Sequence, residues 1–227
     1  FKEQLLYTYY VQDKQFNTTY YYSIFNAHTE TLIDDSVFVA NSDRSCAHFC
    51  ISPDNHYFAL SIWEKTLSKL YLHDFFNNTL LRIDQMNSSD DYHHDSFGLF
   101  DFSPNSEYLS YVKEKDYRYS INNELLIYSI SKQIHVGSTE ISTPLYLYKM
   151  INSIECTYWI SNTILYYKSL DNSAYKEILF CYDTDTGQKK ETSYTNFPTK
   201  CNSYLCFATY NTKTGFFSID IEKDGKI

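Results

Sequence analysis

Helix-forming and basic residues are scarce in this sequence, and each shortage excludes a class of protein. Alanine occurs six times in 227 residues and no long stretch repeats apolar residues at helical spacing, so we expect little helix. Lysine and arginine number 19 against 28 acidic residues, and the net charge of -9 opposes binding to phosphate backbones, so nucleic acid is not an expected partner. The apolar runs fall far short of the roughly 20 residues that a membrane-spanning helix needs, so no membrane span is expected.

The motifs of common catalytic and cofactor sites are also missing. None of the five glycines forms the G-x-S-x-G turn of a hydrolase nucleophile. There is neither an H-E-x-x-H metal motif nor a phosphate-binding G-x-x-x-x-G-K. We therefore expect no catalytic residue and no cofactor within this chain.

The cysteines form no C-x-x-C pair, and they are interleaved with apolar residues. Free buried thiols are therefore favoured over disulfides, which stay open as an alternative. Three N-x-S/T triplets begin at Asn17, Asn77 and Asn87 and could accept glycans in a secreted protein, so both a cytoplasmic and a secreted or periplasmic location stay open. The six cysteines are Cys46, Cys50, Cys156, Cys181, Cys201 and Cys206.

Aromatic residues are abundant, and the segments that contain them repeat along the chain. The 24 tyrosines and 16 phenylalanines favour pleated, half-buried strands. The first half of the repeat is an apolar strand, a Ser-Pro turn and a second strand, found at 49–60 and at 100–111, with a weaker copy at 158–167. The second half is a strand, a polar turn and a return strand, with copies near Tyr20, Leu70, Leu125, Ile178 and Phe216.

The spacing of the copies indicates a β-propeller. The strand after the first turn begins near Leu5, Tyr57, Tyr108, Ile164 and Tyr204, which gives a period of about 50 residues with four short strands per repeat. We predict an all-β chain of four-stranded antiparallel blades, four to five of them visible. The prediction is a single domain or propeller fragment over 1–227, with repeats near 5–37, 45–85, 96–139, 150–195 and 200–227. Its buried inter-blade core is predicted to include Phe102, Tyr108, Leu109, Leu126 and Tyr128.

These repeats resemble the WD40-like propeller repeats of TolB and of the dipeptidyl-peptidase type. In that pattern an F-S-P-D-G-like turn joins the first two strands and a Y-D-x-x-T/S-G-like turn joins the last two. This chain has Phe102-Ser103-Pro104 and Tyr182-Asp183-Thr184-Asp185-Thr186-Gly187, with Asn55 and Ser106 in place of the first-turn glycine. The resemblance implies a fold, because folds of this kind host unrelated functions.

The repeats at the two ends are defective. The first lacks an inner strand before Leu5, and the last repeat is short. Unpaired strand edges invite association, so either the two end segments pair with each other, or flanking blades or a partner strand cover them. We favour an incomplete ring in which 5–11 does not pair with 216–221.

Two polar clusters could bind a ligand or a metal. The stripe formed by Cys46, His48 and Cys50 points to one face of a predicted strand, where a core or channel lining is favoured over metal binding. The other cluster lies between two repeats, where a solvated loop is favoured, and His93, His94 and Asp95 are its metal-ligand candidates. This candidate binding cluster consists of Asp90, Asp91, Tyr92, His93, His94 and Asp95.

Three functions fit these observations. The favoured one is a non-catalytic propeller module that binds a protein or peptide partner on a loop face, because aromatic residues suit interface anchors. The second is the gating propeller of a dipeptidyl-peptidase-like serine hydrolase whose catalytic domain lies outside this chain. The third is a small five-bladed glycan-processing propeller, which needs convergent carboxylates such as Asp101, Glu155 and Asp220.

Overall fold

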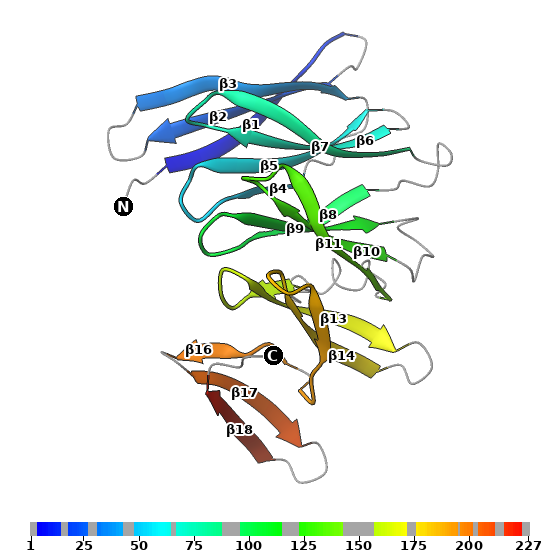
Figure 1. The fold of residues 1–227 in the computed structure, drawn as a ribbon. Coiled ribbons are helices and arrows are strands. Elements are labelled where there is room, and N and C mark those ends of the chain that lie inside the picture. The colour runs from blue at the N-terminus through cyan, green and yellow to red at the C-terminus, as the bar shows by residue number, and fades with distance from the viewer. Residues whose placement is uncertain are drawn as a thin grey trace. The chain divides into compact units, whose positions relative to one another are not determined.

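The fold is known from a computed structural model, whose described residues form strands and turns (Figure 1). They are residues 4–14, 18–26, 31–42, 48–64, 67–87, 96–114, 123–142, 157–171, 176–194, 196–201, 204–211 and 216–223. Within them the strands pair into three four-stranded and two three-stranded antiparallel sheets, each in sequential strand order. The predicted all-β architecture of four-stranded antiparallel units is therefore confirmed. No helix in this part of the chain could cross a lipid bilayer.

The five sheets follow one another along the chain. The first contains β1 (Gln4–Gln12), β2 (Thr18–Asn26) and β3 (Thr31–Ser42). The second contains β4 (His48–Ile51), β5 (Tyr57–Glu64), β6 (Leu67–Asp74) and β7 (Thr79–Asn87). The third contains β8 (Ser96–Phe102), β9 (Tyr108–Glu114), β10 (Asn123–Ser129) and β11 (Ile134–Ile141). The fourth contains β12 (Thr157–Trp159), β13 (Ile164–Asp171), β14 (Lys176–Asp183) and β15 (Gln188–Glu191). The fifth contains β16 (Thr199–Cys201), β17 (Tyr204–Asn211) and β18 (Phe216–Lys223).

The strand that follows the first turn of each repeat begins where the sequence pattern places it. Tyr57, Tyr108, Ile164 and Tyr204 are the first residues of β5, β9, β13 and β17. The chain divides into two compact units, Phe1–Ile51 with Asn55–Phe97 and Ser52–Asp54 with Gly98–Ile227. A single propeller domain over 1–227 stays a prediction.

Both turns of the repeat place a residue in the left-handed backbone region. In the first turn, Asn55 and Ser106 stand where the resembling repeats have glycine, and their φ angles are 59° and 60°. In the turn between the third and fourth strands, Asn78, Gln133 and Gly187 occupy equivalent positions with φ of 49°, 56° and 69°. Glycine adopts this conformation without strain, whereas other residues pay about 1 kcal/mol or more. The repeat thus keeps its turn geometry where it has lost its glycines.

A main-chain hydrogen bond joins the two turns at the same end of each four-stranded sheet. The carbonyl oxygens of His56, Glu107 and Thr163 precede β5, β9 and β13. They accept the N–H groups of Phe75, Ile130 and Thr184, each at 2.9 Å. We call this bond the turn clasp, and it closes the end of the sheet without using a side chain.

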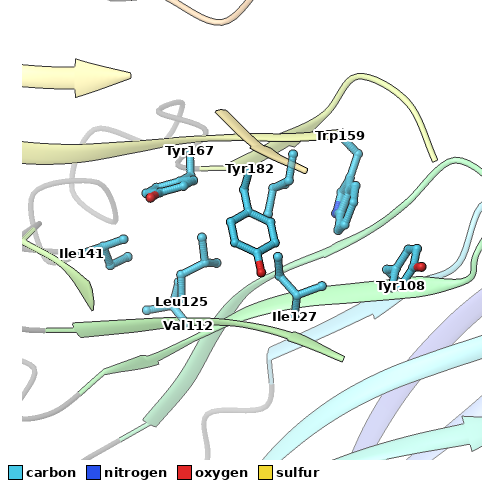
Figure 2. Close-up of a cluster of buried hydrophobic side chains, with 9 residues drawn as sticks. Tyr108, Val112, Leu125, Ile127, Ile141, Trp159, Tyr167 and Tyr182 are labelled. Atoms are coloured by element: carbon cyan, nitrogen blue, oxygen red, sulfur yellow. The ribbon is translucent and has the colours of Figure 1, made fainter. Parts of the chain in front are cut away.

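Large apolar residues fill the space between the third and fourth sheets (Figure 2). Tyr182 and Trp159 of the fourth sheet extend toward the strands of the third, and the Trp159 ring stacks on Tyr108 with centroids 5.9 Å apart. The Trp159 indole donates to the Asp101 carbonyl at 3.2 Å and to Ser110 Oγ at 3.1 Å. The buried members of this cluster are Tyr108, Val112, Leu125, Ile127, Ile141, Trp159, Leu165, Tyr167 and Tyr182.

The five residues predicted to be buried are at most 9% exposed, which confirms their burial. Burial does not alternate along β10, where Leu125, Leu126, Ile127 and Tyr128 are all buried. A strand whose sheet is covered on both faces buries consecutive residues. A second inter-sheet cluster joins the fourth and fifth sheets and consists of Ile160, Tyr166, Leu179, Cys181, Leu205 and Phe207.

The end strands pair only locally in the described part of the chain. β1 pairs with β2, β18 pairs with β17, and no pairing joins β1 to β18. This agrees with the expected lack of pairing between 5–11 and 216–221.

Candidate functional site

An exposed aromatic side chain and a histidine–aspartate pair meet at the turn end of the second sheet. His56 lies in the turn between β4 and β5, and Asp74 ends β6. A meander brings these two turns to the same end, and the turn clasp between His56 and Phe75 fixes their separation. His56 Nε2 then donates to Asp74 Oδ1 at 3.0 Å. We call His56, Tyr57, Asp74 and Phe76 the His56 corner.

Asp74 also organises the turn that follows it. Its Oδ1 accepts the backbone N–H groups of Phe76 at 2.9 Å and Asn77 at 3.0 Å, and its Oδ2 accepts Asn77 Nδ2 at 2.8 Å. Burial alone would raise the pKa of Asp74, but the hydrogen bonds from Asn77 and Phe76 and the nearby His56 outweigh it and lower the pKa. The Asp74 carboxylate therefore has a structural role, which is to hold the turn that contains Phe76 and Asn77.

The turn presents Phe76 to solvent. Its side chain is 72% exposed, the most exposed large apolar side chain among the described residues. The Phe76 ring meets the His56 ring edge-on at 4.4 Å, and His56 stacks on Tyr57 at 4.2 Å. The backbone hydrogen bonds and these ring contacts restrain Phe76 without covering it.

The fourth sheet repeats part of this arrangement. Asp183 Oδ1 accepts the N–H groups of Asp185 at 2.9 Å and Thr186 at 3.4 Å, as Asp74 does in the second sheet. The position equivalent to His56 is Thr163, and the residues after Asp183 are polar, with Gly187 in place of Asn78. The His56 corner is therefore an addition to the common turn and not a requirement of it.

The residues predicted as a binding cluster, Asp90 to Asp95, lie outside the described residues, as do Cys46 and Glu155. His48 begins β4, and the Cys50 thiol contacts the Ile51 carbonyl at 3.6 Å. Asp101 lies in β8, half-buried, and Asp220 lies exposed in β18. The binding cluster and its metal candidates therefore stay predictions. In the part of the chain that the structure describes, no group of three or more His, Cys, Asp or Glu residues could hold a metal ion.

Cys181 and Cys206 are free thiols, as expected for the cysteines of this chain. Cys181 is buried, and that burial is the main cause that raises the pKa of its thiol to about 11. Cys206 is a free thiol but only half-buried.

The His56 corner was not predicted from the sequence. Both of its turns are in the repeat pattern, and Asp74 aligns with Asp183 of the Y-D-x-x-T-G-like turn. In a four-stranded meander, the turn after the first strand and the turn after the third strand lie at the same end of the sheet. This rule of topology, which the repeat pattern does not contain, places His56 beside Asp74.

Comparison with known proteins supports the fold alone. No protein-family model and no curated protein sequence matches this chain. Among solved structures, the β-propeller domain of the Trilobed protease from Pyrococcus furiosus matches 99% of this chain and 66% of its own, with a TM-score of 0.60 and 13% identity. Porphyromonas gingivalis dipeptidyl peptidase 4 matches 97% of this chain and 36% of its own, with a TM-score of 0.57 and 10% identity. Pyrococcus horikoshii acylaminoacyl peptidase matches 98% of this chain and 37% of its own, with a TM-score of 0.57 and 8% identity.

The class of fold follows from these matches and from the sheets described above. The chain consists of β-propeller repeats, as its resemblance to the dipeptidyl-peptidase type of propeller implies. It spans about two thirds of the propeller domain and little more than a third of the two peptidases.

Proposed function

We propose that this chain is a non-catalytic propeller module that docks a protein or peptide partner at the His56 corner. The observation that carries the proposal is Phe76, an aromatic side chain that is 72% exposed yet restrained by the His56 ring and by a turn bonded to Asp74. Aromatic residues are enriched among the anchors of protein interfaces. A restrained anchor also loses less conformational entropy when it binds.

The polar groups around Phe76 suit the rim of such an interface. Asn77 and Asn78 are exposed beside it, and although Asn77 Nδ2 bonds Asp74 and Asn78 Oδ1 bonds His73, the Asn77 Oδ1 can accept from a peptide backbone and the Asn78 Nδ2 can donate to one. The half-buried Tyr57 stacks on the His56 ring, so the histidine that Phe76 contacts is itself held by packing. An apolar centre with a polar rim is the usual composition of a docking surface.

The test is site-specific photo-crosslinking in the native host. A benzoylphenylalanine placed at Phe76 should capture a partner that the same residue placed at Ile134, an apolar side chain 53% exposed on β11, does not capture. The captured partner, once purified, should bind the chain at least about tenfold more weakly when Phe76 is changed to Ala, and with unchanged affinity for Ile134→Ala. Equal capture at both positions, or unchanged affinity for Phe76→Ala, would contradict the proposal.

A second candidate is the gating propeller of a serine hydrolase. It is favoured by the peptidases among the structural matches, of which this chain would represent about a third. The sequence of the whole gene product distinguishes the two. A downstream segment with a G-x-S-x-G turn supports the hydrolase, and a product without one supports the module.

A further inference from the structure

A carboxylate lies beside the exposed Phe76 ring. Asp74 Oδ1 accepts the backbone N–H groups of Phe76 at 2.9 Å and Asn77 at 3.0 Å, so the carboxylate and the ring belong to one turn. Residues 75–78 of this turn include no lysine or arginine. The chain as a whole has a net charge of -9, which attracts basic partners and repels acidic ones. The surroundings of Phe76 therefore favour a partner that carries positive charge.

The other two four-stranded sheets lack this combination of ring and carboxylate. In the third sheet the positions equivalent to the carboxylate and the ring hold Ser129 and Ser131. In the fourth sheet the same positions hold Asp183 and Asp185. Among these three sheets, the second alone places an exposed aromatic ring next to a carboxylate. The combination is thus a local feature of the His56 corner, which the turn itself does not require.

A partner that covers Phe76 also removes water from the neighbouring carboxylate. The Asp74 side chain is 17% exposed, so solvent still reaches part of it. Its Oδ2 accepts Asn77 Nδ2 at 2.8 Å, and a carboxylate oxygen can accept a second hydrogen bond. Covering an ionised group with an apolar side chain is unfavourable, because the lost contacts with water are not replaced. A cation with N–H donors replaces them, so the carboxylate selects a cationic cover over an apolar one.

We propose that the partner of the His56 corner presents an arginine, whose guanidinium stacks on the Phe76 ring and donates to Asp74 Oδ2 and Asn77 Oδ1. This inference rests on the proposed function, because it names the chemistry of the partner that docks there. Cations are attracted to the face of an aromatic ring, and arginine makes this contact more often than lysine. The planar guanidinium can lie on a ring while its edge donates to carboxylate and amide oxygens, whereas the lysine ammonium is a compact and strongly hydrated charge.

Selection from a phage-displayed library of random dodecapeptides tests the proposal without a known partner. The library is selected on the 227-residue chain after removal of the peptides that bind Phe76→Ala, a change at a side chain that is 72% exposed, so the variant should stay folded, as circular dichroism would verify. We expect the recovered peptides to share an arginine. Peptides that depend on Phe76 but share no arginine would overturn this inference and leave the docking site in place. A selection without any Phe76-dependent peptide would overturn both the inference and the proposed function.

Titration calorimetry with a recovered peptide tests the contact itself. Replacing its arginine by citrulline, which keeps the shape and loses the charge, should raise the Kd about five- to thirtyfold. Phe76→Leu keeps an exposed apolar side chain without an aromatic face, and it should raise the Kd for the arginine peptide by a similar factor. The two changes together should cost little more than either alone, because they remove the same contact. Phe76→Tyr is the matched control, because it keeps the ring, and its Kd should stay within about twofold of that of the wild type.

Stepwise fluorination of the Phe76 ring separates a cation–aromatic contact from an apolar one. Each fluorine withdraws electron density from the ring face and weakens its attraction for a cation, while the ring stays apolar. The Kd of the arginine peptide should therefore rise from the unsubstituted ring through one, two and three fluorines. A Kd that is unchanged or falls along this series would overturn the proposal, as would a citrulline peptide that binds as tightly as the arginine peptide.

Discussion

Gly137 is the residue whose substitution best tests the packing between the third and fourth sheets. It is opposite Ile127, next to the irregularity where Tyr128 pairs with His135, and the end of the Tyr182 ring lies against it. A Cβ at this position would stand 2.8 Å from Tyr182 Cζ and 3.1 Å from Cε1. Tyr182 is only 7% exposed and belongs to the inter-sheet cluster, so its ring has little room to move.

The expected effect of Gly137→Ala is a loss of about 0.5 to 2 kcal/mol in the free energy of unfolding. Overpacking a filled core costs about 1 to 3 kcal/mol, and alanine recovers about 0.5 to 1 kcal/mol because it loses less backbone entropy than glycine. Gly137 has an ordinary φ, so backbone strain adds nothing. The predicted destabilisation therefore comes from the contact with Tyr182 alone.

Urea unfolding of four chains separates this contact from other effects. In Tyr182→Leu, which removes the ring atoms that Cβ would meet, Gly137→Ala should become neutral or stabilising, so the coupling between the two changes should be about 1 to 2 kcal/mol. If Gly137→Ala stabilised the wild-type chain, or cost the same in both backgrounds, the packing described between the two sheets would be wrong.

Three further predictions concern single residues. Gln133→Gly should raise the free energy of unfolding by about 0.5 to 1 kcal/mol, because Gln133 is exposed with φ of 56°. Gly187→Ala should lower the free energy of unfolding by at least as much, because Gly187 has φ of 69° at the equivalent turn position. Urea unfolding measures both changes, and the same sign for the two would contradict the turn assignment. The folded-state pKa of Asp74 lies below its usual 3.8, so the stability that the Asp74 carboxylate contributes is present above pH 3.8 and is lost as the pH falls through the folded-state pKa. The difference in stability between wild type and Asp74→Asn should therefore shrink from about pH 6 to about pH 3. A difference that stays constant over this range would refute the prediction. The thiol of Cys181, buried with a pKa near 11, should react with iodoacetamide at pH 8 much more slowly than that of Cys206, as mass spectrometry of labelled peptides would show, and equal rates would contradict its burial.

The sequence was sufficient to place the strands of the repeat. Tyr57, Tyr108 and Ile164 begin their strands as predicted, because strand propensity and turn chemistry are local properties that recur at a fixed spacing. The replacement of glycine by Ser106 did not obscure the turn, since the flanking Ser-Pro pair still marks it. The propeller fold could be predicted for the same reason.

The contacts between sheets could not be predicted in the same way. The burial of every residue from Leu125 to Tyr128 depends on cover from both sides, which the strand pattern alone does not specify. The proximity of His56 to Asp74 depends on the topology of a meander, because 18 residues separate them in the chain.

The turn clasp has a consequence for how this chain changes over evolutionary time. Its donors and acceptors are main-chain atoms, contributed by residues as different as His56, Glu107 and Thr163. Substitution at these positions preserves the bond as long as the residue that replaces Phe75, Ile130 or Thr184 is not proline, which has no N–H group. The turn clasp itself therefore sets no requirement on the side chains at these positions other than the exclusion of proline, and they can drift as far as their own packing allows. Such drift lets a chain keep this architecture while sharing only 8 to 13% of its residues with structures that superpose on it.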